Sequence, residues 1–378
     1  MRRTLTRGPR MAKLRMGMVG CGDISDRFFK MAEHIDEAEF VATCARRVEN
    51  ARRKGEQYGV GSCYSSYERM MDAEELDAVF VTTPHSVHAE VCLAAIERGL
   101  HVLNEKPMAT SLEDCRAMAD AADEADVTFM ALPYDQNGAI LTAQSLLRER
   151  YIGKITGGEA CLNIPGPPRD NWYYDQSVAH GGAMLDCFVY PAGRVTSLLG
   201  GASRVTAMVN TLIPKRIVGD GKRVDSDVDD NVTLVVEYAG GQHVVIRSLW
   251  GAAYAENSTT IYGRDGSVIL PGDGRVILQR RDGVCDVEGA EPTEWRGWSG
   301  CFAVPTVSGV ENMTAHFVRC ILDNEEPTCS GARTLHVHEI MFGGYESAET
   351  GQTVTLYTDY ESWHDLDPSI FDTRSDFI

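Results

Sequence analysis

The stretch "MVGCGDIS" (residues 18–25) decides the fold of the first half of this chain. An apolar run, "LRMGMVG" (14–20), ends in Gly20, and Gly22 follows before a helix that we predict from about Ile24. Where a strand is followed by a glycine turn and then a helix, the backbone can approach a pyrophosphate, and the positive N-terminal end of the helix attracts it. The turn therefore predicts a dinucleotide site, and an ordinary tight turn is the alternative.

Short apolar runs alternate with helical stretches as far as about residue 132. The predicted strands are 14–20, 38–45, 76–84, 100–105 and 127–133, and the predicted helices start near 24 and cover 48–59, 86–99 and 111–126. Strands that are apolar throughout and alternate with helices are typical of a parallel sheet covered on both faces. Because such crossovers are right-handed, we expect a doubly wound Rossmann domain over residues 13–134.

The pattern changes after about residue 150, where β-rich stretches are joined by Gly-Gly and Asp-Gly turns. "VEYAGGQHVVI" (236–246) predicts a hairpin, and 311–324 and 335–351 predict two late helices. We therefore expect an α+β domain with a mostly antiparallel sheet over residues 135–365. Residues 1–12 are expected to be a disordered extension, with Met11 as a possible functional start, and 366–378 a C-terminal tail.

Composition excludes several classes of partner. The 378 residues carry a formal net charge of −19, whereas nucleic acids and anionic membranes attract basic proteins. No apolar run approaches the roughly 20 residues that span a bilayer. The eleven cysteines are odd in number and lack CxxC spacing, which indicates reduced thiols in a cytoplasmic protein rather than disulfides or a metal site.

The end of the second predicted strand bears on cofactor choice. An NAD site usually has a carboxylate here for the ribose hydroxyls, but the sequence supplies Ala45, Arg46 and Arg47. Because a guanidinium can pair bidentately with a 2′-phosphate, we expect NADP, with NAD as the alternative. The arginines could also simply border a solvated loop.

Two further loops should reach the same edge of the sheet. "TTPHSVH" (82–88) ends one predicted strand and "NEKP" (104–107) ends the next, and ligands of such sheets bind at the carboxyl ends of the strands. Lys106 would then lie near the nicotinamide, where an ammonium can donate to a substrate oxygen or transfer a proton. A plain salt bridge with Glu105 is the alternative.

With these motifs the chain resembles the Gfo/Idh/MocA family of oxidoreductases. The resemblance runs from about residue 13 to 358, and the stretches that carry it are "VGCGDIS", "TTPHSVHAEVCLAAIERGLHVLNEKPMATSLEDC", "GGAMLDCFVYPAGRVTSLLG", "VDDNVTLVVEYAGG", "IYGRDGSVIL" and "YESAETGQTVTL". It implies a catalytic lysine in the "EKP" motif, Lys106, and an open-faced sheet that forms the subunit interface. It also implies a cofactor site formed by Gly20, Gly22, Asp23, Ile24, Ala45, Arg46, Arg47, Thr83, Pro84, His85, His88, Glu105 and Lys106.

The family's second motif is a glycine pair, an aspartate and then a histidine or tyrosine. Here these positions are Gly181, Gly182, Asp186 and Tyr190, and Phe188 replaces the usual glycine. The tyrosine is similar to the branch of glucose-fructose oxidoreductase and the dihydrodiol dehydrogenases. Four positions apart on one helix face, Asp186 and Tyr190 could both address a substrate hydroxyl. Without the resemblance, Tyr190 would be interpreted as a core residue.

Other candidates rest on weaker patterns. His85 and His88 have HxxH spacing but no further ligand nearby in sequence, so we expect no metal. Trp172 is a possible substrate contact, as is Tyr173, in the loop "PGPPRDNWYYD" (165–175), with loop packing the alternative. Asn137 could contact substrate or cap a helix. In "LHVHEI" the three polar residues His336, His338 and Glu339 are expected to be structural.

These observations predict an NADP(H)-dependent oxidoreductase acting on a secondary alcohol of a sugar, cyclic polyol or glycoside. Catalysis is assigned to Lys106, Tyr190 and Asp186, and substrate binding to these three with Asn137 and Trp172. A dihydrodiol-type alcohol dehydrogenase is the enzymatic alternative, and a non-catalytic cofactor-binding regulator is the alternative of another class. An open sheet should expose apolar surface unless another subunit covers it, so we expect a homodimer or homotetramer.

Overall fold

The computed structural model describes residues 13–133, 137–168, 172–219, 221–238, 240–293, 299–308 and 312–358. The expected extension (1–12) and tail (366–378) lie outside the described residues. Unit 1 comprises Met1–Tyr134 and Asn312–Leu335, and unit 2 comprises Asp135–Glu311 and His336–Ile378. Among the described residues, no helix has both the length and the apolar character that a membrane span requires.

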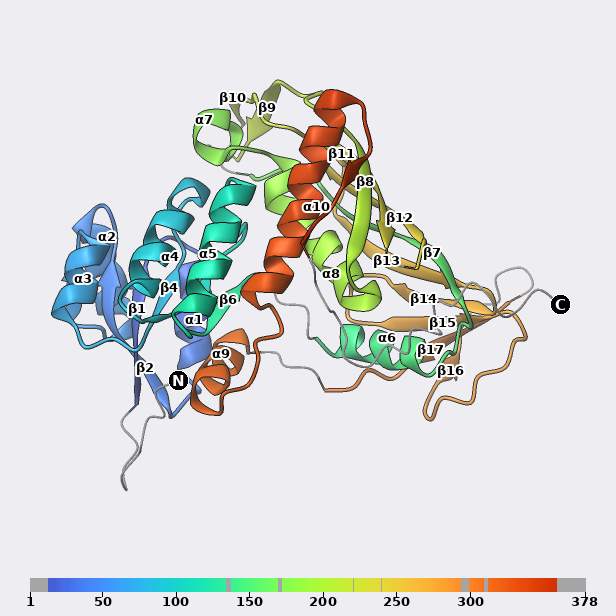
Figure 1. Cartoon of the computed structure of the whole chain (residues 1–378), viewed down its shortest axis with the longest axis horizontal. Helices are drawn as coiled ribbons and strands as arrows, with labels where there is room; N and C mark the ends of the chain where they lie inside the picture. Colours follow the sequence, from blue (N-terminus) through green and yellow to red (C-terminus); the bar gives the residue numbers. More distant parts are fainter. Residues whose placement is uncertain are drawn as a thin grey trace. The chain divides into compact units, whose positions relative to one another are not determined.

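Unit 1 is built on a parallel sheet of six described strands in the order β3-β2-β1-β4-β5-β6 (Figure 1). This is the strand order in which a nucleotide binds at the switch point between β1 and β4. The strands are β1 (Leu14–Val19), β2 (Ala38–Cys44), β3 (Ser62–Tyr64), β4 (Ala78–Val81), β5 (His101–Asn104) and β6 (Phe129–Ala131). The helices are α1 (Ser25–Ala32), α2 (Val48–Tyr58), α3 (Tyr67–Ala73), η1 (His85–Val87), α4 (His88–Ile96), α5 (Leu112–Glu124) and α9 (Met313–Leu322).

Aromatic rings connect the sheet of unit 1 with α1 and α9. Phe28 on α1 and Phe317 on α9 both meet the ring of Phe80 on β4 edge-on, with centroids 5.5 and 5.4 Å away. All three side chains are fully buried, and burial of a phenylalanine stabilises a fold by about 1.5–3 kcal/mol. The late helix α9 is therefore part of the core of unit 1, whereas the domain limits expected from the sequence assign its residues to 135–365.

Unit 2 contains a mixed sheet of ten described strands in the order β16-β17-β15-β14-β13-β7-β12-β11-β8-β18. Only β7 and β12 run parallel among its described pairs, so the expected mostly antiparallel sheet is confirmed. Its strands are β7 (Ile155–Ile164), β8 (Ala202–Asn210), β11 (Asn231–Tyr238), β12 (His243–Trp250), β13 (Glu256–Gly263), β14 (Gly266–Leu270), β15 (Val276–Arg280), β16 (Glu291–Pro292), β17 (Gly300–Val304) and β18 (Val354–Thr355). A separate hairpin pairs β9 (Lys215–Val218) with β10 (Lys222–Asp225).

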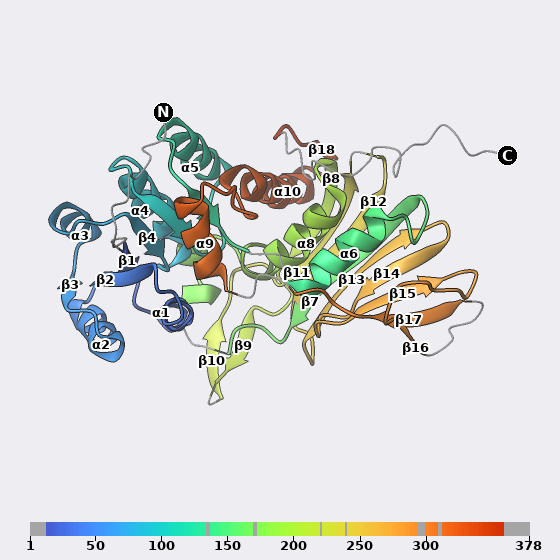
Figure 2. The same ribbon diagram turned by 90° about the horizontal axis from the view of Figure 1, so that it is seen from below.

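Helices pack on one face of this sheet (Figure 2). They are α6 (Gly138–Arg148), α8 (Val189–Leu199) and α10 (Gly331–Thr350), and the shorter turns of the unit are η2 (Trp172–Tyr174), α7 (Gln176–Ala179) and η3 (Met184–Phe188). The other face exposes apolar side chains among polar ones. Met208 is 79% exposed there, and Val235 and Val245, which pair directly across β11 and β12, are 41% and 44% exposed.

Most predicted elements are confirmed in type and approximate bounds. The predicted hairpin pairs Glu237 of β11 with His243 of β12. In unit 2 the sequence analysis missed α6, β7 and the hairpin of β9 and β10. In unit 1 it missed β3 and α3, which lie between the second and third predicted strands. β3 has three residues and α3 seven, and neither is long enough for a hydrophobic period to stand out.

Candidate active site

Gly20 ends β1 at the switch point of the unit 1 sheet. Its φ is +100°, and a Cβ placed on it would lie 2.5 Å from the carbonyl carbon of Thr82. Its N–H donates to Cys44 O at 2.8 Å, and its carbonyl accepts from the Thr82 hydroxyl at 2.6 Å. Only glycine fits where the ends of β1, β2 and β4 converge so closely.

The next part of the turn has room for a ligand. A Cβ at Gly22 would meet nothing within 4 Å. Helix α1 begins three residues later, and Ile24 at its N-cap makes no side-chain capping bond. Ser25 replaces the third glycine of the usual motif, is fully buried and donates to Gly22 O at 2.6 Å. Open space beside an uncapped helix N-terminus fits a pyrophosphate group.

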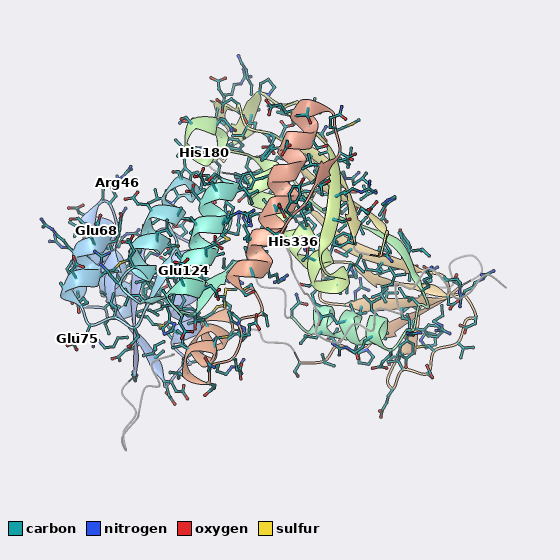
Figure 3. The ribbon with its side chains drawn as sticks, in the orientation of Figure 1. Arg46, Glu68, Glu75, Glu124, His180 and His336 are labelled. Atoms are coloured by element: carbon teal, nitrogen blue, oxygen red, sulfur yellow. The ribbon has the colours of Figure 1, made fainter. Side chains whose placement is uncertain are left out.

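Arg46 and Arg47 follow β2 and are both exposed (Figure 3 labels Arg46). Neither guanidinium has a carboxylate partner among the described residues, whereas Arg98 and Arg204, for example, are ion-paired. Arg47 is the N-cap residue of α2 in an extended conformation. The arginines are therefore available for a phosphate rather than committed to a salt bridge.

The backbone around Lys106 is held by the side chains before it. Lys106 itself is half-buried and its peptide bond to Pro107 is cis. The Glu105 carboxylate, 7% exposed, accepts the Lys106 backbone N–H at 2.9 Å, and Asn104 Nδ2 donates to Met108 O at 2.8 Å. These bonds fix the turn that presents the lysine at the carboxyl end of β5.

The two histidines of the HxxH spacing are buried. The His88 ring, which has no exposed surface, has Nε2 2.9 Å from Thr83 O and Nδ1 2.7 Å from Pro107 O. The His85 ring lies 6.0 Å from it in an edge-on arrangement. Both ring nitrogens of His88 thus face carbonyl oxygens, and no cluster of three or more potential metal ligands occurs in the described ranges.

Asp186 and Tyr190 of unit 2 lie on consecutive helical segments. Asp186 is in η3, a π-helical turn, and Tyr190 is in α8; π turns inside helices are frequent at functional sites. Asp186 is 7% exposed, and Tyr190 is half-buried against the core of unit 2. Both interpretations of Tyr190, site residue and core residue, are compatible with this position.

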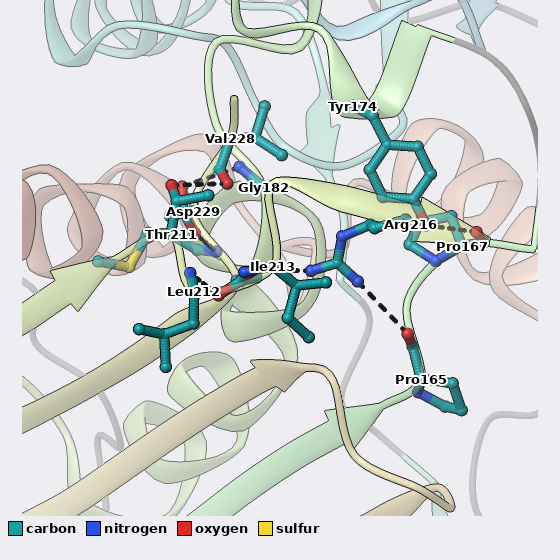
Figure 4. Close-up of polar contacts among 12 residues, drawn as sticks. Pro165, Pro167, Tyr174, Gly182, Thr211, Leu212, Ile213, Arg216, Val228 and Asp229 are labelled. Atoms are coloured by element: carbon teal, nitrogen blue, oxygen red, sulfur yellow. Dashed lines mark hydrogen bonds and ion pairs between the residues drawn. The ribbon is translucent and has the colours of Figure 1, made fainter. Parts of the chain in front are cut away.

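A second carboxylate, Asp229, holds the start of that helical segment (Figure 4). Its oxygens accept the N–H groups of Gly182 at 2.8 Å and Met184 at 2.7 Å, and the Tyr345 hydroxyl donates to it at 2.6 Å. A Cβ on Gly182 would lie 1.9 Å from Asp229 O. Burial and this carboxylate raise the pKa of Tyr345 well above its usual value, so the hydroxyl keeps its proton.

The Asp186 carboxylate also has a neighbour that orients it. Trp250 Nε1 donates to Cys187 Sγ at 3.1 Å, and Cys187 Sγ donates to Asp186 Oδ2 at 3.4 Å. All three side chains are buried. The indole N–H thus holds the sulfur in place, and the thiol donates to the Asp186 carboxylate.

A buried arginine holds the aromatic loop. Arg216 of β9 pairs with Asp230 at 2.9 Å, and both are less than a tenth exposed. Its guanidinium lies over Tyr174, 5.4 Å from the ring centroid, and donates to Pro165 O at 3.5 Å (Figure 4). Trp172 stacks on Tyr173 with centroids 4.1 Å apart. Residues 169–171 of the loop lie outside the described residues.

Asn137 caps a helix, which was the alternative to substrate contact in the sequence analysis. Its side chain accepts the Ile140 N–H at 3.1 Å at the start of α6. Its contact with substrate stays a prediction. On α10, His336 accepts the Ala202 N–H at 2.8 Å through Nε2 and contacts the Thr358 hydroxyl at 2.7 Å through Nδ1 (Figure 3). Glu339 accepts the Thr358 N–H at 2.8 Å, so the polar residues of this helix hold the chain after β18.

The structure thus brings the predicted unit 1 residues to one edge of its sheet. There Gly20 O accepts a hydrogen bond from Thr82, just after β4, and the His88 ring contacts the carbonyl oxygens of Thr83 and Pro107. In unit 2 it puts Asp186 and Tyr190 on adjoining turns. Sequence reasoning missed Asp229, Arg216 and Cys187. The carboxylates in "DVDDN" directly before β11 were a usable signal for Asp229, because acids rarely occupy such buried positions without partners.

Two family models together match most of the chain. The model described as "Oxidoreductase family, NAD-binding Rossmann fold" matches residues 14–132, and that of the "GFO/IDH/MocA C-terminal domain" matches residues 140–269. The second match covers η3, α8 and most of the large sheet.

Individual relatives agree with these models. Levoglucosan dehydrogenase of Pseudarthrobacter phenanthrenivorans is 26% identical over 299 residues, covering 71% of this chain and 76% of that protein. D-xylose 1-dehydrogenase (NADP(+)) 2 of Haloferax volcanii is 28% identical over 350 residues, covering 90% and 99%. A solved structure of levoglucosan dehydrogenase with NADH and L-sorbose shares the fold, with a TM-score of 0.78 at 22% identity over 92% of this chain and 100% of that one. The chain therefore belongs to the Gfo/Idh/MocA family and is a nicotinamide-dependent oxidoreductase.

Proposed function

We propose that this protein is an NADP(H)-dependent dehydrogenase or reductase of a sugar, cyclic polyol or glycoside. The observation that carries the proposal is the edge of the unit 1 sheet, where the open glycine turn after β1 and Lys106 after β5 stand at the carboxyl ends of parallel strands. Ligands of doubly wound sheets bind there. The bound nicotinamide supplies the hydride chemistry.

The chain's own residues handle the hydroxyl proton and the position of the substrate. Lys106 and Tyr190 share transfer of the hydroxyl proton, a task suited to an ammonium or phenol within hydrogen-bond reach. Asp186 accepts a hydrogen bond from the substrate, and the Cys187 thiol, which donates to its Oδ2, orients the carboxylate. Trp172 and Asn137 complete the proposed substrate contacts, and the stacked ring of Trp172 suits the C–H face of a sugar.

NADP rather than NAD is proposed from the end of β2. Arg46 is exposed and has no carboxylate partner among the described residues, so a 2′-phosphate can pair with it. Arg46→Ala should weaken NADP binding by about 1.5–3 kcal/mol, typical of a charged hydrogen bond, and leave NAD binding nearly unchanged. Arg52→Ala, which removes an exposed arginine from α2, is the control. Equal dissociation constants of the unmutated protein for NADP and NAD would contradict the proposal.

Assembly and location are also proposals. The exposed apolar residues on the open face of the unit 2 sheet, among them Met208, Val235 and Val245, support a homodimer or homotetramer joined within about residues 200–300. All eleven cysteines are thiols in the structure. This supports a cytoplasmic location, since reducing compartments preserve thiols.

A substrate panel with two variants tests the function. Sugars, inositols and glycosides are screened with both cofactors at the NADPH absorbance band, and the best substrate is then used. Lys106→Ala should lower kcat by about 10²–10⁴-fold, as expected for lost acid–base catalysis, with little change in NADP(H) affinity. Tyr190→Phe should also lower kcat, and the double variant should lose less than the sum.

Lys13→Ala is the matched control, because this exposed lysine of unit 1 pairs only loosely with Glu39, at 3.6 Å. It should leave kcat unchanged. A folded Lys106→Ala protein with near-normal turnover would make the lysine a structural residue and overturn its proposed role.

A further inference from the structure

His88 stands where two loops of the candidate site meet. It is the first residue of α4, and its ring reaches Thr83 O in the loop after β4 and Pro107 O in the turn after β5. Both loops supply proposed cofactor or catalytic residues. The ring has no exposed surface, so water does not compete for either contact.

The two contacts require more protons than a neutral ring has. Carbonyl oxygens only accept, whereas a neutral imidazole donates from one nitrogen and an imidazolium from two. Burial lowers the pKa of His88 and outweighs the two carbonyl contacts, which raise it, and the positive charge of Lys106 adds to the lowering. The neutral ring is therefore favoured, and its single proton goes to one carbonyl. The contact with Pro107 O is the shorter, at 2.7 Å against 2.9 Å for Thr83 O, so we assign the proton to Nδ1.

We propose that His88 is a positioning residue for Lys106, holding the Pro107 carbonyl with Nδ1–H and so fixing the backbone from which the lysine projects. This inference rests on the proposed role of Lys106. The Glu105 carboxylate holds the N–H of Lys106 from one side, and His88 holds the next carbonyl from the other. The turn is thereby tied to α4, whose Val91 and Cys92 side chains are fully buried, and a catalytic side chain needs such support.

Three substitutions separate this role from simple packing. His88→Asn puts an amide N–H near the place of Nδ1 and keeps the bond to Pro107 O. His88→Gln carries its amide farther out, towards Thr83 O. His88→Leu fills the space and makes neither bond. His316→Leu is the control, because His316 is a buried histidine of unit 1 that accepts from Thr328 N–H, in a loop without candidate site residues.

Kinetics and melting temperature are measured on the full chain with the best substrate of the panel. His88→Leu should lower kcat by roughly 10²-fold, the effect of a displacement of about 1 Å at a reacting group. His88→Asn should recover most of this loss and His88→Gln little. His316→Leu should lower the melting temperature without lowering kcat. Equal losses in the Asn and Leu variants, or wild-type kcat in a folded Leu variant, would overturn the inference.

A second readout does not depend on turnover. Acetic anhydride at limiting concentration labels lysines, and mass spectrometry compares Lys106 with Lys13 in the protein without cofactor. The relative labelling of Lys106 should change in His88→Leu, return in His88→Asn and stay constant in His316→Leu. If no substrate of the panel is turned over, the proposed function fails, and unchanged labelling in His88→Leu would separately refute the positioning role.

Discussion

Alanine at Gly20 should lower the stability of the protein, whereas alanine at Gly22 should lower its affinity for NADPH, although the two glycines are only two residues apart. At Gly20 the backbone has a positive φ, which costs a non-glycine residue about 1–3 kcal/mol. The added methyl would also press on the Thr82 backbone at 2.5 Å, and overpacking costs a further 1–3 kcal/mol or so. The expected loss of stability is therefore about 2–6 kcal/mol.

Such a loss should be visible in the melting of the protein. At about 2–4 °C per kcal/mol for a domain of this size, the Gly20→Ala variant should melt roughly 5–20 °C below the unmutated chain. The methyl of Gly22→Ala meets nothing within 4 Å, so its melting temperature should stay nearly constant, as surface changes rarely exceed about 0.5 kcal/mol. The same methyl stands where the backbone would approach a pyrophosphate, and NADPH affinity should fall at least about tenfold, or about 1.4 kcal/mol.

Differential scanning calorimetry and NADPH fluorescence titration on both variants measure the two effects. A Gly20→Ala protein that melts like the unmutated chain would refute the packing described for the end of β1. An unchanged NADPH dissociation constant in Gly22→Ala would refute the placement of the phosphates at this turn.

Three other predictions concern unit 1, unit 2 and assembly. Asp229→Asn puts an NH₂ group against backbone N–H donors and should cost about 1–3 kcal/mol in urea unfolding, whereas Asp225→Asn on the exposed hairpin should cost little. Burial alone would raise the pKa of Asp26, but hydrogen bonds from buried Lys54 and from Tyr58 outweigh it and lower the pKa; the stability that Asp26 adds over Asp26→Asn should thus be full above about pH 4 and vanish as pH falls through the lowered pKa, with equal unfolding at neutral pH refuting this. Light scattering should give at least twice the 41.5 kDa of one chain, and a monomer mass at micromolar concentration would refute the expected assembly.

Most strands of unit 1, the glycine turn and the hairpin were predictable because each depends on neighbours in sequence. Gly20 illustrates this. The apolar run before it and the helix after it already require a sharp turn, of the kind at which a backbone can come close to a pyrophosphate. The exposure of Arg46, which has no carboxylate partner among the described residues, could likewise be expected from the residues around it. Local structure of this kind is determined by residues that are adjacent in the sequence.

Long-range partners were not predictable from one sequence. Asp229 holds Gly182, and Arg216 holds Pro165, across 47 and 51 positions of the chain. The placement of α9 depends on Phe317 reaching Phe80, which no local pattern records. For Asn137 the sequence offered two roles, and the capping bond became visible only with the start of α6. The catalytic assignments of Lys106, Tyr190 and Asp186 stay predictions.

The return of residues 312–335 to unit 1 has a consequence for biosynthesis. When the ribosome has made residue 134, the sheet of unit 1 is complete, but Phe80 still lacks the ring of Phe317. The roughly 200 residues up to Leu335 take about 10–40 s at about 5–20 residues per second. During that interval the nascent sheet exposes an apolar face beside α1, and we expect chaperones to bind there until α9 emerges.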